Sequence, residues 1–463
     1  MTKDIAPPAP GAKVGLKRAV GTPLLFAFIV GDTLGAGIYT LVGTMADDVG
    51  GVIWLPLLIA LVVALLTAGT YAELITKYPH AGGAARYVDR AFNVPYLSFL
   101  VGFLMMASGI TTAAALANAF AGDYLGALID VPQIPTAIVF IILLTLINLR
   151  GVRESLAANL IASVIEVTGL VIVIVIAAIV LGSGNGEPAR IFEFAPDVPP
   201  LQGAFAASIV AFFSFLGFEA AANMAEEVKN PSKAYPRALF GAIITAAVVY
   251  LLIAIGAVIV LPPADLAEST GPLLDVVAAS GLGVPNWLFG LIALVAIANG
   301  ALLFMVMASR VSYGLATAGL LPRMFERVLP KRRTPWVSIL AVAGATILLS
   351  LIGDVATLAE TTVLLLLLVF LSANVSVLVL KTKDPVDHPH FTVPRIVPIL
   401  AIIASIVLLT QQSWTVWLGA LAYIAVGSAL FLVARYTRKR GDDRASARED
   451  AATAPGAAAS DPE

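Results

Sequence analysis

Three carboxylates stand near the middle of long apolar stretches of the sequence, where charged residues are rare. Asp32 lies within Gly31–Tyr39, Glu219 follows Phe215-Leu216-Gly217-Phe218, and Glu166 lies deep in the run 156–181. An ionisable group in such a setting is costly and usually marks an ion, proton or solute pathway. A buried carboxyl without a cation partner can bind a proton reversibly. Asp32 can instead cap a helix end, and Glu166 can be a permanently neutral hydrogen-bonding acid.

Both Asp32 and Glu219 are accompanied by glycines, which indicates helices interrupted near their middle. Gly31, Gly35 and Gly37 surround Asp32, and Gly217 precedes Glu219. Glycine can simply permit close packing of membrane helices. Backbone freed by a helix break, however, is tolerated inside a membrane only where it lines a cavity or is buried in protein.

A broken helix offers two kinds of backbone group to a ligand. Free N–H groups at the start of a half-helix, at the positive end of its dipole, suit a carboxylate. Free carbonyl groups at the end of the opposing half-helix suit an ammonium group or another cation. Both together match the backbone of an α-amino acid, and they leave its side chain undetermined.

The composition indicates that most of the chain is embedded in a lipid bilayer. Of its 463 residues 59% are hydrophobic and only 13% charged, and the mean hydropathy is +0.94. Soluble domains carry roughly 25% charged residues. A net charge of −2 gives no reason to expect a nucleic-acid partner, and the absence of cysteine excludes thiol chemistry. His388 and His390 lie in a polar segment, so we predict no metal and no cofactor.

About twelve apolar runs are long enough to be membrane spans. They are Gly21–Met45, Gly51–Thr76, Val94–Ala121, Ile134–Leu149, Leu156–Leu181, Leu201–Ala225, Ala238–Leu261, Val284–Ser309, Pro335–Ile352, Val355–Leu380, Pro394–Thr410 and Ser413–Tyr436. The sequence therefore predicts an all-α polytopic membrane protein.

The positions of lysine and arginine predict the orientation. If the N-terminus is cytosolic, Arg190 is the only one of the 28 cationic residues that falls in an outside segment. Cytosolic loops carry the excess of such residues, and an error of one span in the middle would destroy the asymmetry. We therefore expect both termini in the cytosol and the protein in the plasma membrane.

The spans divide into segments of different expected roles. Spans one and six, which carry the glycine-rich interruptions, occupy equivalent positions in two five-span halves that run in opposite directions through the membrane. Interrupted helices at matching places in inverted repeats indicate the substrate site of a transporter.

The predicted segments are a disordered tail (1–20), a first repeat (21–182), an extracellular loop (183–200), a second repeat (201–380), two further spans (381–436) and a second disordered tail (437–463).

Four motifs in series resemble those of the amino acid–polyamine–organocation superfamily. The first is Gly35-Ala36-Gly37-Ile38-Tyr39 in span one, and the second is the loop from Tyr78 to Tyr87. The third begins at Phe215-Leu216-Gly217-Phe218-Glu219 and continues to Ala238. The fourth combines Ala308-Ser309-Arg310 with Gly319-Leu320-Leu321-Pro322. The motifs occur in order over about 300 residues, at the expected spans.

The resemblance implies the leucine-transporter-type fold of five plus five helices with two more at the C-terminus, and transport of amino acids or related amines. It implies that the N–H groups of Ala36, Gly37 and Ile38 hold the substrate carboxylate. The residues whose carbonyls would hold the amino group are Thr33, Phe213 and Leu216, with the Phe213 ring as a cover. Many relatives have serine in place of Ala36, so one hydroxyl contact is lost.

The resemblance also bears on the driving ion. It links Glu219 to gating or proton sensing, and some proton-coupled relatives carry lysine where Glu166 stands. Span eight offers only Ser309 where sodium-coupled members have a hydroxyl pair, so sodium coupling is disfavoured. We predict coupling or gating roles for Glu166, Glu219 and Asp32, with protons or exchange as the driving force. Candidate side-chain discriminators are Ser108, Thr111, Thr112 and Asn299, although Ser and Thr also join membrane helices.

Two other classes of function are less consistent with the sequence. A major-facilitator carrier usually has a long cytosolic loop between spans six and seven, which here has roughly a dozen residues, and Val88-Asp89-Arg90 lacks the glycines of its signature. An intramembrane enzyme needs a nucleophile, a base or metal ligands at membrane depth, and none is evident. The sequence thus predicts a permease rather than an enzyme.

Overall fold

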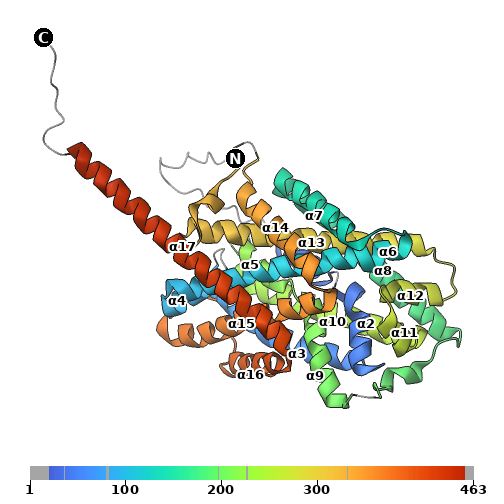
Figure 1. The fold of residues 1–463 in the computed structure, drawn as a ribbon. Coiled ribbons are helices and arrows are strands. Elements are labelled where there is room, and N and C mark those ends of the chain that lie inside the picture. The colour runs from blue at the N-terminus through green and yellow to red at the C-terminus, as the bar shows by residue number, and fades with distance from the viewer. Residues whose placement is uncertain are drawn as a thin grey trace, which may run out of the picture.

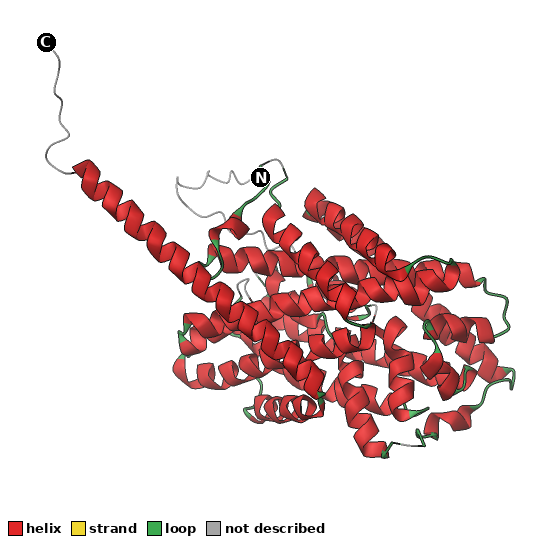
Figure 2. Ribbon diagram, in the orientation of Figure 1, coloured by secondary structure: helices red, strands yellow, loops and turns green. Residues whose placement is uncertain are grey.

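The structure is a computed structural model that describes residues 20–453 except Ala36, 80–82, Asp197, 226–227 and Lys331. The described chain is almost entirely helical (Figures 1 and 2). Its one β-type pairing is an isolated parallel bridge between Val20 and Val228. Helices satisfy their own backbone hydrogen bonds, which is what a bilayer requires of a spanning segment.

Twenty-one helical elements follow one another along the described part of the chain. The first ten are α1 (Thr22–Thr33), α2 (Gly37–Val49), α3 (Trp54–Lys77), α4 (Gly83–Phe92), α5 (Pro95–Asn118), η1 (Ala119–Tyr124), α6 (Leu125–Leu128), α7 (Gln133–Arg150), α8 (Val152–Gly182) and η2 (Pro188–Phe192). The others are α9 (Pro200–Ser214), η3 (Phe218–Met224), α10 (Pro231–Val260), α11 (Pro263–Glu268), α12 (Pro272–Ala279), α13 (Asn286–Thr317), η4 (Arg323–Glu326), α14 (Trp336–Ile352), α15 (Val355–Lys383), α16 (Ile396–Gln411) and α17 (Trp414–Thr453).

Each predicted apolar run contains a long helix, a bent pair of helices or a shorter apolar helix. Among the described residues, 8 helices are long and apolar enough to cross a membrane, and the bent pair α1 and α2 raises this number to 9. The remaining runs contain the shorter apolar helices α9, α14 and α16. The prediction of an all-α polytopic membrane protein is confirmed.

Loops predicted to share one side of the membrane meet in the structure. At the Lys- and Arg-rich end, Lys77 donates a hydrogen bond to the Leu380 carbonyl at 2.7 Å, which joins the C-terminal ends of α3 and α15. At the other end, Trp54 donates to the Ile191 carbonyl at 2.9 Å, which joins the start of α3 to η2. The alternation of loops between two ends supports the predicted succession of spans.

The C-terminal segment differs from the prediction. Disorder was expected from residue 437, whereas α17 continues to Thr453, and it projects away from the bundle in Figure 1. Alanine and arginine are frequent in this stretch, and both have high helix propensity. A composition without apolar periodicity therefore does not exclude a helix.

The two broken helices lie beside each other at the centre of the fold. The first half of one, α1, packs against η3 and α10, whereas its second half, α2, packs against α9. The halves of the two broken helices are thus paired in opposite order, as expected for helices that run in opposite directions. The short helix α11 covers α2 at the end away from the Lys- and Arg-rich loops.

Candidate functional site

The first break separates α1 from α2 by a bend of 45°. Helix α1 ends at Thr33, and the N–H of Leu34 closes the last turn by donating to Val30 at 2.7 Å. Helix α2 starts at Gly37, so the N–H groups of its first turn have no carbonyl partner within the helix. Ala36, the predicted carboxylate ligand between them, lies outside the described residues.

The second break follows α9, which ends at Ser214. Two tighter hydrogen bonds finish this helix: Phe215 N–H donates to the Phe212 carbonyl at 3.0 Å, and Leu216 N–H to the Phe213 carbonyl at 3.2 Å. Gly217 then adopts a φ of +118°, which side-chain-bearing residues rarely adopt, and η3 begins after it.

Glycine allows the two breaks to touch. A Cβ atom on Gly37 would lie 2.9 Å from the Cα of Ser214, and one on Gly217 would lie 2.7 Å from the carbonyl oxygen of Asp32. Both distances are too short for ordinary packing against backbone. The start of α2 therefore packs against the end of α9 at Gly37, and the second break packs against the end of α1 at Gly217. Only glycine fits at these two positions.

Tyr250, from the middle of α10, joins the two helix ends. Its buried hydroxyl donates to the Thr33 carbonyl and lies 2.9 Å from the Ser214 carbonyl. A phenol has one proton to donate, so it can satisfy only one of these acceptors at a time. The other carbonyl remains open to a second donor. Thr33 is one of the residues predicted to bind the substrate amino group.

Helix α8 is tied to both halves of the first broken helix, which places Glu166 beside the break. A Cβ on Gly31 would lie 2.8 Å from Ser163 Oγ, so α8 packs closely on α1. On the other half, the Tyr39 hydroxyl donates to the Glu166 backbone carbonyl at 2.8 Å. Ser163 and Glu166 are three residues apart and therefore share a helix face.

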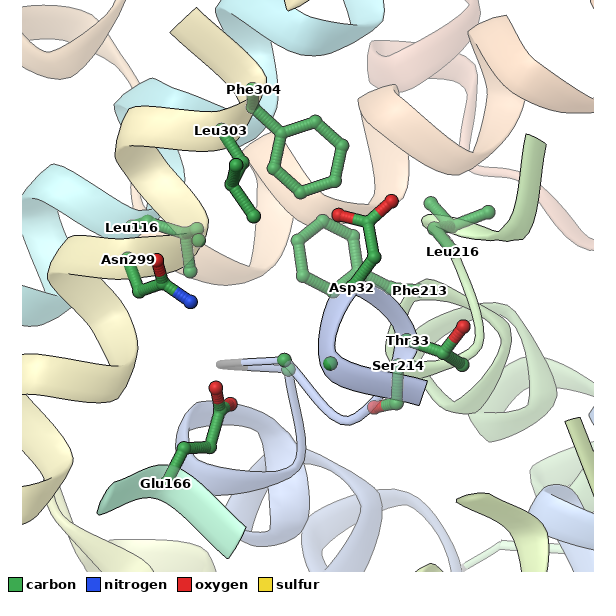
Figure 3. Close-up of a pocket in the computed structure, with 14 residues that line it drawn as sticks. Asp32, Thr33, Leu116, Glu166, Phe213, Ser214, Leu216, Asn299, Leu303 and Phe304 are labelled. Atoms are coloured by element: carbon green, nitrogen blue, oxygen red, sulfur yellow. The ribbon is translucent and has the colours of Figure 1, made fainter. Parts of the chain in front are cut away.

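A small cavity of about 20 Å³ lies between the breaks (Figure 3). This volume holds about one water molecule. Among the residues predicted for the site, it is lined by Asp32, Thr33, Gly35, Gly37, Glu166, Phe213 and Leu216. The structure is consequently a closed form, in which side chains or half-helices must move before an amino acid fits.

Apolar side chains fill the space next to the cavity. Leu116, Leu303 and Phe304 line it, together with the Phe213 ring and the amide of Asn299. Figure 3 shows Asn299 and Glu166 extending from α13 and α8 towards the break, with the Phe213 and Phe304 rings on the side of Asp32. The wall opposite the helix ends is thus mainly hydrocarbon, with one neutral polar group.

Each of the three predicted carboxylates has a buried oxygen atom without a hydrogen-bond partner in the described part of the chain. These atoms are Asp32 Oδ2, Glu166 Oε1 and Glu219 Oε1. Asp32 is close enough to interact electrostatically with both glutamates. An unpartnered carboxylate in a buried place is expensive, whereas a protonated one or one paired with a cation is less so. The arrangement can therefore hold a proton or an ammonium group.

Glu219 does not line the cavity but stabilises the second break. Its Oε2 accepts a hydrogen bond of 2.9 Å from the N–H of Gly217, at the positive end of η3. Gly217 likewise contacts Asp32 without lining the cavity. Ile38 is fully buried in α2 and is not among the lining residues. Glu219, Gly217 and Ile38 thus lie at the two breaks but outside the lining of the cavity.

The predicted side-chain discriminators separate into two groups. Asn299 lines the cavity. Thr111 lies 2.9 Å from the Tyr423 hydroxyl, and Thr112 donates to Thr362 at 3.2 Å, so both join helices. Ser108 donates to the Met105 carbonyl of its own helix at 2.8 Å.

Sequence reasoning missed Tyr250, Ser214 and Phe304. The signal available for Tyr250 was its hydroxyl in an otherwise apolar run, since a buried tyrosine usually finds a hydrogen-bond partner. Ser214 adjoins Phe213, which was predicted for the site, and Phe304 lies in the same span as Asn299, but neither has a spacing that distinguishes it from core packing.

Comparison with known proteins extends over nearly the whole chain. The profile of a family described as amino acid permease matches residues 20–436. The branched-chain amino acid permease BcaP of Bacillus subtilis is 26% identical, over 94% of this chain and 96% of its own length. The vacuolar cationic amino acid transporter 2 of Arabidopsis thaliana is 31% identical, over 81% of this chain and 61% of its own length.

A third relative is named for a different substrate. The methylthioribose transporter of Bacillus subtilis is 27% identical, over 89% of this chain and 91% of its own length. These relatives are membrane transporters, as the predicted resemblance implied. The chain belongs to the amino acid permease family of the amino acid–polyamine–organocation superfamily.

Proposed function

We propose that this protein is a secondary active permease of the plasma membrane that binds the zwitterionic backbone of an amino acid where its two broken helices cross. The observation that carries the proposal is the contact of the two breaks at Gly37 and Gly217. It brings the free N–H groups of the α2 start close to the carbonyl groups that end α1 and α9. A carboxylate and an ammonium group separated by one carbon atom match this arrangement.

The substrate carboxylate would bind at the start of α2, at Gly37, Ile38 and the neighbouring Ala36. The amino group would bind to the carbonyls of Thr33, Phe213 and Leu216. In the closed form the Tyr250 hydroxyl uses the Thr33 carbonyl. A substrate ammonium, with three protons to donate, can replace this bond and also reach the second helix end.

The side chain of the substrate would lie against the apolar wall formed by Leu116, Leu303 and Phe304. This wall supports a neutral, apolar side chain such as that of leucine or valine, in keeping with the name of the branched-chain permease of Bacillus subtilis. A cationic amino acid is the second candidate, because Asp32 and Glu166 have unpartnered oxygens beside the cavity.

Alternating access would be driven by protons or by exchange, with Glu166 as the coupling group. Glu166 lies at the junction of α8 with both halves of the first broken helix. A proton on it removes a like charge facing Asp32, so protonation can bias how α1 and α2 pack. We further propose that Glu219 and Asp32 gate the second break, that both termini face the cytosol, and that sodium plays no part.

The test is uptake into proteoliposomes of a labelled panel containing leucine, valine, lysine, arginine and methylthioribose, with and without an inward proton gradient. Uptake of a neutral amino acid that is raised by the gradient supports the whole proposal. Uptake of lysine and arginine alone supports the second candidate. Transport of methylthioribose without any amino acid would refute the proposed substrate class.

A further inference from the structure

A second and larger cavity lies at the Lys- and Arg-rich end of the bundle. Its volume is about 410 Å³, within the ordinary range for ligand sites. It lies between the C-terminal ends of α7 and α13 and the segment that connects η4 to α14. It shares no lining residue with the cavity between the helix breaks.

Two arginines from different elements line this cavity. Arg310 belongs to α13 and Arg333 to the segment before α14. Within the described part of the chain neither guanidinium group makes an ion pair, and no carboxylate is among the described lining residues. Asn148, Ser309 and Thr334 add neutral polar groups. Guanidinium groups with no anionic partner attract an anion, and their planar shape matches a phosphate.

The loop that carries Arg333 is anchored on the end of α7. The Thr334 hydroxyl donates to the Leu149 carbonyl at 3.1 Å, and the Arg332 guanidinium donates to the Arg150 carbonyl at 3.2 Å. The backbone of Arg333 has a φ of +54°, a left-handed conformation that residues other than Gly and Asn seldom adopt. The anchored loop thus holds an arginine at the cavity in a strained backbone conformation.

The outer surface of α7 leads from the membrane interior to this cavity. Val139, Ile142, Leu143 and Leu146 are all exposed, and their spacing places them on one face of the helix. In a bilayer this stripe faces lipid tails, and it ends at Leu146, close in sequence to Asn148 and Gly151, which line the cavity at the end of α7. An acyl chain on the stripe would place its headgroup at the same end of α7 as the arginines.

We propose that this cavity binds a phosphate-bearing anion, and that the headgroup of an anionic lipid supplies it. Basic pockets between membrane helices on the cytoplasmic side bind such headgroups. The same chemistry would also bind a free phosphate, so lipid and soluble sources are compared in the test. The site is independent of the proposed transport cycle, because it uses no residue of the central cavity.

The experiment uses the purified full-length chain after removal of lipid. Binding of phosphatidylglycerol, phosphatidylcholine and inorganic phosphate is measured by native mass spectrometry and by the shift in thermal unfolding temperature. The double variant combines Arg310→Gln with Arg333→Asn. Asparagine is chosen at position 333 because it tolerates the left-handed backbone conformation. Arg395→Gln removes an exposed arginine at the start of α16 and serves as the control.

The wild type and Arg395→Gln should prefer phosphatidylglycerol over phosphatidylcholine by about tenfold or more, and the double variant should lose this preference. If the wild type and Arg395→Gln bind inorganic phosphate and the double variant does not, the result would also support the site, with a soluble phosphate in place of a lipid headgroup. If the double variant does not fold, Arg310→Lys should keep the lipid preference and Arg310→Gln should weaken it. Equal binding of both lipids by the wild type, with no phosphate binding, would overturn the proposal.

Discussion

The hydroxyl of Tyr250 donates a hydrogen bond to the carbonyl oxygen of Thr33, at the end of α1. The same hydroxyl lies 2.9 Å from the carbonyl of Ser214, at the end of α9. The side chain therefore bridges the two helix ends whose carbonyls we propose for the substrate ammonium. Loss of this bridge should destabilise the closed, substrate-free form more than the form with substrate bound.

Tyr250→Phe should lower the stability of the substrate-free protein by about 1–2 kcal/mol, because a buried carbonyl loses its donor. Saturating substrate should restore much of the loss, since the ammonium group replaces the hydroxyl. Thermal unfolding with and without substrate measures both effects. The control is Tyr124→Phe, which removes a hydrogen bond of 2.7 Å to the Tyr39 carbonyl, away from the helix ends. Equal restoration by substrate in both variants would contradict the assignment.

Gly37→Ala should reduce the transport rate by at least about tenfold without preventing membrane insertion. The new Cβ would lie 2.9 Å from the Cα of Ser214, so the two breaks must move apart. Gly35→Ala should have a smaller effect, because its nearest neighbour is the Asp32 carbonyl at 3.4 Å. Gly344→Ala, whose Cβ would meet nothing within 4 Å, is the neutral control. Normal uptake by a well-expressed Gly37→Leu protein would show that the substrate does not bind at the start of α2.

Glu166→Gln mimics the protonated acid, and it should keep substrate binding and exchange while abolishing accumulation driven by a proton gradient. The observation behind this prediction is the unpartnered Glu166 Oε1 at the cavity. Counterflow and gradient-driven uptake in proteoliposomes separate the two activities. Asp32→Asn and Glu219→Gln are the comparisons. Accumulation that survives in Glu166→Gln but not in Glu219→Gln would transfer the coupling role to Glu219.

Replacement of sodium by N-methylglucamine at constant pH should leave uptake unchanged. Ser309 is the one hydroxyl that the sequence offers in span eight, and its Oγ donates to the Val306 carbonyl at 2.9 Å in the second cavity. A sodium ion needs several oxygen ligands around one point. Uptake that disappears without sodium would show a cation site elsewhere in the structure.

Much of this fold was predictable because membrane helices carry strong local signals. Apolar runs marked the spans, and the glycines around Asp32 and before Glu219 marked both breaks. These signals arise from the exclusion of water, which acts on each helix separately. The family resemblance implied that Thr33, Gly37 and Phe213 belong to one site, and they line one cavity.

Contacts between distant segments were less accessible to prediction. Glu73 accepts a hydrogen bond of 2.6 Å from Lys381, 308 residues away, and another of 2.9 Å from the N–H of Val393. This pair fastens α3 to α15, yet each residue alone resembles an ordinary charge at a helix end. Tyr250 was missed for the same reason: its partners become visible only once α10 is placed against both breaks.

The most direct test of the central claim is to measure by calorimetry how tightly leucine, leucinamide and N-acetylleucine bind to the purified protein. If the uptake panel identifies another amino acid as the substrate, the corresponding derivatives of that amino acid are used. Recognition of the zwitterion at the helix breaks predicts that either blocked derivative binds at least about tenfold more weakly than the free amino acid, equivalent to about 1.4 kcal/mol. Gly37→Ala should weaken the free amino acid to a similar degree. Equal binding of all three compounds, undiminished by Gly37→Ala, would show that the helix breaks do not hold the substrate backbone.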